Sequence, residues 1–144
     1  MSVSPQERAF VEQARVGHLA TTDDVGQPHV VPFCFAFANE QIVSAIDEKP
    51  QNTSPLQLRR VRNVQENPAV SVIVDRYVED WDRLGWVRID GRCEVCNPNE
   101  TTHDGAIAAL LEKYDQYEDH RLEERPLLAI EPRSVSSWGT LSWD

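Results

Sequence analysis

The sequence predicts a mainly β protein, a small antiparallel barrel with two or three helices packed outside it. The chain has 144 residues, which is enough for one hydrophobic core and short for two. About six or seven short runs rich in apolar and β-branched residues are separated by turn residues, as in antiparallel sheets. Between these runs stand segments that carry the start signals of helices. We therefore expect a single domain over residues 1–144.

The composition is that of an ordinary globular protein. Apolar residues make up 40% of the chain and charged residues 26%, and the formal net charge is −10. This negative charge disfavours nucleic acid and anionic membranes, which bind proteins mainly through basic surface. The longest apolar run, at 30–38, is far shorter than the ~20 residues of a membrane-spanning helix, and the first residues lack a signal core. We expect a cytoplasmic protein without nucleic-acid or membrane partners.

The cysteines and histidines do not form a metal motif. Cys93 and Cys96 make one C-x-x-C pair, but the second pair of ligands that a structural zinc site needs does not follow. Residues three apart on a strand point to opposite faces, so Cys93 and Cys96 could share a metal ion only at a bulge. We therefore expect both to be reduced thiols without a metal. Among the scattered histidines, His18 is expected to have a structural role, and His103 and His120 to lie on helix surfaces. No metal site is predicted.

The first third of the chain predicts one helix followed by three strands. Ser4, Pro5 and Glu7 have the spacing of a capping box with proline at the first helical position. The strands are expected to form an antiparallel meander. Their sequences are VGHLATT, HVVPFCFAF and IVSAI. Pro32 lies inside the second strand and cannot donate a ladder hydrogen bond, which favours an edge strand or a bulge.

The next helix is expected over residues 54–67. Its start signals are Ser54 as N-cap, Pro55 in the first turn and Gln57, which completes an S-x-x-Q capping box. It should end before Pro68. Residues at a spacing of three form its buried stripe. They are Leu58, Val61 and Val64.

Three arginines lie near the start of this helix, in a chain that is acidic overall. Arg59 should point away from the buried stripe, while Arg60 and Arg62 lie on its two flanks. A helix start offers unpaired N–H groups, and two adjacent arginines there can hold a phosphate by charge-assisted hydrogen bonds. Alternatively, the arginines only pair with surface acids such as Glu66 or Asp75. The pattern leaves both interpretations open.

The second half of the chain predicts further strands and one longer helix. Two strands, AVSVIVDRY and GWVRIDGRCEV, are joined by a loop in which Trp81 either roofs a planar substrate or caps the barrel end. A helix should start at Asn97 and end near residue 117. Its apolar stripe has helical spacing and comprises Ile107, Leu110, Leu111 and Tyr114. Two short strands are expected in RPLLAIEPRSVSSW.

The order of these motifs resembles the flavin-binding split-barrel superfamily, that of pyridoxamine 5'-phosphate oxidase and its deazaflavin-dependent relatives. The collinear motifs are GHLATTDDVGQPHVVPFCF, IVSAIDEKP, the arginine helix ending in NPAVSVIV, and WVRIDGRCEV. Within the superfamily, residues 59–91 are similar to the branch described as probable coenzyme F420-dependent enzymes. The resemblance runs from about Val16 to Val95. It implies a split β-barrel of six or seven antiparallel strands with two or three outer helices.

The resemblance also implies a homodimer with the cofactor in a groove between subunits. In the family, a basic residue eight positions before the helix-ending proline binds the cofactor phosphate, and this position is Arg60, with Arg59 beside it. The other positions implied to contact the cofactor are His29, Val31 and Pro32 under the ring system, Ser44, Ile46 and Asp47 in VSAID, Lys49 in the next loop, and Trp86. Trp86 either stacks on the cofactor or belongs to the core.

Three functional hypotheses follow from the resemblance. The chain ends SSWGTLSWD, without the histidine that helps clamp the substrate of the vitamin oxidases, which argues against pyridoxamine phosphate oxidase activity. The first hypothesis is an oxidoreductase that uses coenzyme F420 for hydride transfer to a small conjugated or heteroaromatic substrate, and the second replaces F420 with FMN. The third is a non-catalytic split barrel that carries a cofactor or binds haem, with His29 or His18 as axial ligand. The catalytic residues and the substrate stay open.

Overall fold

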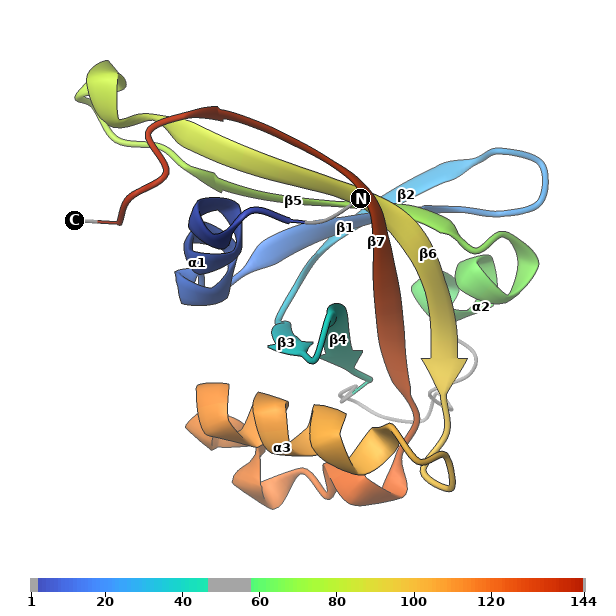
Figure 1. Ribbon diagram of the computed structural model, residues 1–144. Coiled ribbons are helices and arrows are strands. Elements are labelled where there is room, and N and C mark those ends of the chain that lie inside the picture. Colours follow the sequence, from blue (N-terminus) through green and yellow to red (C-terminus); the bar gives the residue numbers. More distant parts are fainter. Residues whose placement is uncertain (1–2, 47–57, 144) are drawn as a thin grey trace.

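The computed structural model describes residues 3–46 and 58–143 (Figure 1). Its strands form one antiparallel sheet in the order β2-β1-β5-β6-β7-β4-β3, which curls into a half-barrel. The predicted mainly β fold, with seven strands and three α-helices in the described part of the chain, is confirmed. The strands are β1 (Gly17–Thr22), β2 (Pro28–Phe33), β3 (Ala36–Ala38), β4 (Gln41–Ala45), β5 (Ala69–Arg76), β6 (Gly85–Cys96) and β7 (Leu127–Gly139). The helices are α1 (Pro5–Gln13), α2 (Arg59–Glu66) and α3 (His103–Lys113), with short 3-10 helices at η2 (Trp81–Arg83), η3 (Asp115–Asp119) and η4 (Leu122–Glu124).

The predicted three-strand meander is wrong, because its members occupy both edges of the sheet. β1 and β2 form a hairpin at one edge, whereas β3 and β4 form one at the other, where β4 pairs with β7. The apolar run breaks after β2, where side chains replace the ladder hydrogen bonds. The Ser44 hydroxyl donates to the Cys34 carbonyl at 2.8 Å, and the Phe35 N–H donates to the Tyr114 hydroxyl at 3.2 Å. Pro32 lies in edge strand β2, as predicted.

The first helix forms as the sequence predicts. The Glu7 N–H donates to Ser4 Oγ at 3.1 Å and the Ser4 N–H donates to Glu7 Oε1 at 3.0 Å, so the capping box is complete. The C-terminal tail packs onto this helix. Trp143 stacks on Phe10 at a centroid distance of 4.8 Å, and its indole N–H donates to the Phe10 carbonyl at 2.7 Å.

The end of the chain forms one long strand instead of the two predicted short ones. β7 pairs with β6 along its whole length, with a register shift between Asp90 and Gly91. A Cβ on Gly91 would lie 2.4 Å from the Glu131 carbonyl oxygen, so only glycine permits this close approach. The irregularity is therefore absorbed by a bulge, and the strand continues past Pro132.

The bounds of the other helices differ from the predicted ones. α2 begins at Arg59, with Leu58 as an N-cap that makes no side-chain bond, and Ser54, Pro55 and Gln57 lie outside the described residues. α3 begins at His103 and not at Asn97. The predicted capping signal forms a turn instead, in which the Asn97 N–H donates to Glu100 Oε2 at 2.9 Å.

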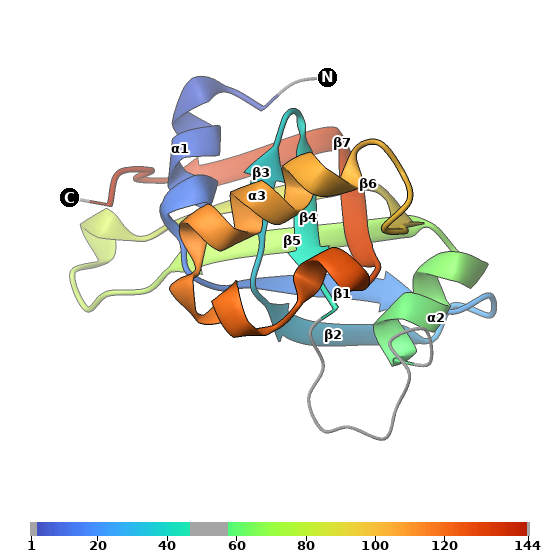
Figure 2. The same ribbon diagram turned by 90° about the horizontal axis from the view of Figure 1, so that it is seen from below.

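The hydrophobic core has two parts, one on each side of β4. The first lies between the concave face of the sheet, α1 and α2, and the second lies under α3, which crosses β3 and β4 (Figure 2). The predicted stripe of α3 packs into the second part. His103 also lies there, fully buried, with Nε2 bonded to the Arg125 carbonyl at 2.7 Å, so its predicted place on the helix surface is wrong.

Candidate functional site

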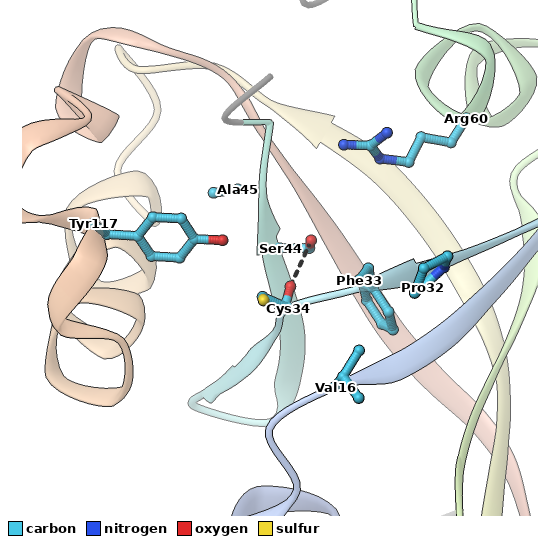
Figure 3. A pocket seen from close by; sticks show the side chains of 8 residues that line it. All are labelled: Val16, Pro32, Phe33, Cys34, Ser44, Ala45, Arg60 and Tyr117. Atoms are coloured by element: carbon cyan, nitrogen blue, oxygen red, sulfur yellow. Dashed lines mark hydrogen bonds between the residues drawn. The ribbon is translucent and has the colours of Figure 1, made fainter. Parts of the chain in front are cut away.

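A cavity of about 250 Å³ opens where the end of β2, β4, the start of α2 and η3 meet (Figure 3). Its lining residues are Val16, Pro32, Phe33, Cys34, Ser44, Ala45, Arg60 and Tyr117. Pro32, Ser44 and Arg60 are among the positions that the family resemblance implies as cofactor contacts. The fold thus brings three of the predicted site residues, from three different elements, to one cavity.

Arg60 supplies the positive charge of this lining. It lies in the first turn of α2, where the helix dipole and unpaired N–H groups favour an anion. Its Nε atom is buried and has no hydrogen-bond partner. An unpaired buried donor costs about 1–3 kcal/mol, and more when the group is charged. This orphaned guanidinium donor, directed to a cavity, indicates a binding site for an anionic group.

The alternative interpretation of the arginines, a surface ion-pair cluster, is not found within residues 3–46 and 58–143. No ion pair there joins Arg59, Arg60 or Arg62 to an acid. Glu66, one of the proposed partners, instead accepts the Asp24 N–H at 3.2 Å. Arg59 and Arg62 are exposed, and Arg60 alone of the three lines the cavity.

The arrangement of α2 on the sheet fixes the position of Arg60. Val61 and Val64 are buried, as predicted, and Asn63 is buried beside them. The Asn63 side-chain amide donates to the Thr21 hydroxyl at 2.9 Å, and the amide of Asn67 donates to Thr22 Oγ1 at the same distance. Two hydrogen bonds to β1 therefore hold both the middle and the end of the helix.

Polar groups on the opposite walls complete the cavity. Ser44 is buried, and its hydroxyl proton is used in the bond to the Cys34 carbonyl, which leaves the oxygen as an acceptor. Tyr117 in η3 lines the cavity from the far side and packs edge-on against Tyr114 and His120. Sequence reasoning missed Tyr117, although it continues the spacing of three that ends the predicted stripe at Tyr114.

The remaining predicted contacts lie away from this cavity in the single chain. His29 and Val31 alternate with Pro32 along β2, and both are half-buried on the other face. His29 Nδ1 is buried without a hydrogen-bond partner. Ile46 is fully buried in the core, and Trp86 pairs with Trp138 at the end of the sheet remote from α2 (Figure 1). Two further predicted contacts, Asp47 and Lys49, lie outside the described residues.

The cysteines, His18 and Trp81 were also weighed as site residues in the sequence. Among the described residues no group of His, Cys, Asp and Glu could hold a metal ion. Cys93 and Cys96 are buried free thiols, and burial raises the pKa of Cys93 to about 12. His18 is exposed on β1, and Trp81 is 69% exposed, so Trp81 does not cap the barrel end. None of the described helices has the length and apolar character that crossing a membrane requires.

The curled antiparallel sheet with its outer helices defines a flavin-binding split barrel. The sequence matches the family model described as pyridoxamine 5'-phosphate oxidase over residues 3–139, and the chain belongs to this family. Comparison with curated proteins finds no match.

Solved structures share the fold at low sequence identity. A conserved hypothetical protein from Mycobacterium tuberculosis is 24% identical, with a TM-score of 0.74 over 94% of this chain and 84% of that one. A FAD-binding protein from Mesorhizobium loti is 26% identical, with a TM-score of 0.66 over 90% of this chain and 87% of that one. The haem storage protein HutZ from Vibrio cholerae is 19% identical, with a TM-score of 0.73 over 96% of this chain and 95% of that one. Proteins that bind different cofactors thus share this architecture.

Proposed function

We propose that this protein is an oxidoreductase that binds coenzyme F420, with FMN as the alternative, and transfers hydride between it and a small conjugated or heteroaromatic substrate. The observation that carries the proposal is the buried, unpartnered Nε of Arg60 at the cavity. Both cofactors contain a phosphate, which is the group that an arginine at a helix start recognises best. The choice of F420 before FMN rests on the sequence resemblance at residues 59–91.

The residues of the cavity fit one part of such a cofactor. Its volume of about 250 Å³ is below the ~300–1,000 Å³ of pockets that bury a whole small-molecule ligand. It suits the phosphate and the chain next to it, and the ring system requires further surface. In this proposal Arg60 holds the phosphate, and Pro32 and Ser44 form the walls.

A second subunit is the proposed source of the missing surface. Phe33, Phe35 and Ala36 of the apolar run at 30–38 are buried within this chain. The outward sheet face nevertheless exposes apolar side chains, with Val30 at 62% and Trp138 at 54% exposure. Trp86 lies beside Trp138 in the register, on this face. We propose a homodimer through this face, in which Trp86 contributes to the site from the second subunit.

In this reaction the cofactor and the protein have separate roles. A bound flavin or deazaflavin supplies the hydride chemistry, and the protein binds it, orients it and excludes water. The lining residues of the cavity do not include an evident catalytic nucleophile paired with a general base, which agrees with chemistry supplied by the cofactor. The Arg60 guanidinium neutralises the phosphate charge, and the buried ring of Phe33 keeps water from one side of the ligand.

Titration of the purified protein with F420 and, separately, with FMN tests this proposal. Tighter binding of F420, followed by fluorescence, is expected. Arg60→Ala should weaken binding about ten- to a hundredfold, because a charge-assisted hydrogen bond contributes about 1.5–3 kcal/mol. Arg62→Ala, which removes an exposed arginine of the same helix, is the matched control. Tighter binding of FMN would replace F420 by FMN, and failure to bind either cofactor would refute the proposal.

Haem binding is the second candidate. It is favoured by the likeness to the haem storage protein from Vibrio cholerae and by the buried, unpartnered Nδ1 of His29. A ring nitrogen without a hydrogen-bond partner is available as a metal ligand. Reconstitution with haemin distinguishes the candidates: a Soret band that His29→Ala abolishes would support a haem protein, and its absence would exclude this role.

A further inference from the structure

His18 lies on the outward face of the sheet, at the edge of the cavity. Burial alternates along this part of the chain: Val16 and His18 are exposed, whereas Gly17 and Leu19 are buried. Successive side chains of an extended chain point to opposite faces, so Val16 and His18 share one face. Val16 lines the cavity (Figure 3). The His18 ring is therefore on the side of β1 from which the cavity is lined.

A second lining residue lies directly opposite His18. His18 pairs with Pro32 of β2 in the antiparallel register, and Pro32 is exposed on the same face of the sheet. The Cβ atoms of residues paired in this way are about 4.5–5.5 Å apart. In the described part of the chain the His18 ring makes no hydrogen bond or ion pair. The imidazole thus borders the cavity, and its ring nitrogens are available to a ligand.

The neighbours of His18 on this face are mostly apolar. The strands that pair with β1 place three apolar residues beside it, Val30, Pro32 and Ile73. The nearest charged groups are Asp75, which is diagonal to His18 on β5, and Arg88, which lies beyond Ile73 on β6. Arg88 forms an ion pair with Asp90 at 3.7 Å. His18 is therefore a group next to the cavity that can exchange a proton near neutral pH.

Reduction of a conjugated acceptor needs a proton as well as a hydride. When hydride adds to the β carbon of a carbon–carbon double bond conjugated to a carbonyl, the electron pair of that bond moves to the α carbon, and a proton must join it there. Thiols, phenols, hydroxyls and guanidinium groups, the types found in the described cavity lining, ordinarily hold their protons at neutral pH. An imidazolium releases its proton readily in this range.

We propose that His18 is a catalytic residue that donates this proton to the substrate. The inference rests on the proposed function, because it takes the hydride to come from a reduced flavin or deazaflavin. One ring nitrogen of His18 gives its proton to the α carbon, where a C–H bond forms, and the neutral imidazole regains a proton from water. The substrate gains one hydride and one proton, so its double bond becomes a single bond while the cofactor loses two electrons.

Two probe acceptors, 2-cyclohexen-1-one and menadione, separate proton donation from hydride transfer. Each is assayed with the reduced form of whichever of F420 and FMN binds the wild type more tightly. The enone needs a proton on carbon, whereas a reduced quinone takes protons on oxygen, which water supplies directly. His18→Gln should therefore lower kcat for the enone about a hundredfold, lower kcat for menadione much less, and leave the Kd of the cofactor unchanged.

The pH dependence and the His18 ring signals provide independent readouts. Wild-type kcat for the enone should fall as the pH rises between about 5 and 8, because an imidazolium ordinarily loses its proton in this range. His18→Gln should lack this dependence, and Asp75→Asn, which removes the neighbouring carboxylate, should keep it. By NMR, the His18 ring signals should shift when the oxidised cofactor binds, whereas those of His103, buried under α3, should not.

The outcomes separate this inference from the proposed function. An unchanged enone kcat or pH dependence in His18→Gln, or His18 ring signals that do not respond to the cofactor, would refute proton donation by His18 and leave the proposed function standing. Equal losses with both acceptors, or weaker cofactor binding, would indicate a role in binding and would also refute it. A wild type that binds neither cofactor would refute both. A wild type that binds a cofactor but reduces neither acceptor would refute hydride transfer to conjugated acceptors, and this inference with it.

Discussion

Replacing Lys113 by Met should stabilise the protein at neutral pH. Lys113 ends α3, and its Nζ atom is buried without a hydrogen-bond partner, 4.0 Å from the centroid of the Phe35 ring. Burial, and next the charge of Arg15, lower the pKa of this ammonium from 10.5 to about 8, although Cys34 and Glu12 act in the opposite direction. The charged Lys113 ammonium therefore destabilises the native state.

The size of the expected gain in the free energy of unfolding follows from this pKa. Without solvent screening, the difference between the pKa values of 10.5 and about 8 would correspond to a destabilisation of the native state by about 3 kcal/mol at pH 7. The side chain is only partly buried, so solvent screening reduces the cost to about 2 kcal/mol. The contact with the Phe35 ring and the position at a helix C-terminus offset part of it. We expect Lys113→Met to gain about 1 kcal/mol, or a Tm higher by about 3 °C.

The stability gained by Lys113→Met should decrease as the pH rises from 8 to 10.5. Below pH 8 Lys113 is charged in both states, and the native state bears the full cost. Between pH 8 and 10.5 the native state loses its proton before the unfolded state does, so the stability of the wild type rises with pH. The advantage of Lys113→Met should therefore shrink over this range.

Urea unfolding at pH 7 and pH 10 measures both the stability gained by Lys113→Met and its decrease with pH. Arg62→Met, which removes an exposed cation from α2, serves as the control and should show no such pH-dependent gain. The reasoning is refuted if Lys113→Met is less stable than the wild type at pH 7, or if its advantage is the same at both pH values. Either result would mean that the ammonium is well stabilised where it lies.

Three further predictions concern the assembly and the fold. Light scattering should find a dimer at micromolar concentration, and a stable monomer would contradict the proposed interface. Trp143→Ala should lower the free energy of unfolding by about 2 kcal/mol, because it removes the stacking on Phe10 and a hydrogen bond. Exposed Trp81→Ala should change it by less than ~0.5 kcal/mol, and equal losses in urea unfolding would disprove the role of the tail. Gly91→Ala should lower Tm by several degrees, since its Cβ would clash with the Glu131 carbonyl, and an unchanged Tm would show that the bulge adapts.

The fold class was predictable because it depends on local patterns. The capping box at Ser4, the buried stripe of α2 and the edge position of Pro32 follow from helix capping, periodicity and proline chemistry. The pairing of β4 was not predictable in the same way. Its partner β7 lies far along the chain, and no local pattern of residues 41–45 specifies it.

The candidate site was predictable only in part, for a related reason. Arg60 could be predicted because the family resemblance places a phosphate-binding basic residue eight positions before Pro68, and the fold places Arg60 at the cavity. Tyr117 reaches the same cavity through the packing of η3, which depends on contacts with Tyr114 and His120. His103 escaped prediction because the carbonyl of Arg125, which permits its burial, lies on another element.

The crystal structure of the protein with bound F420 or FMN tests the central claim most directly. We predict that the cofactor phosphate lies within hydrogen-bond distance of the Arg60 guanidinium, at the start of α2, in the cavity formed with Pro32 and Ser44. The ring system should extend toward a second subunit. A phosphate bound elsewhere, with the Arg60 Nε still unpartnered, would contradict the proposal.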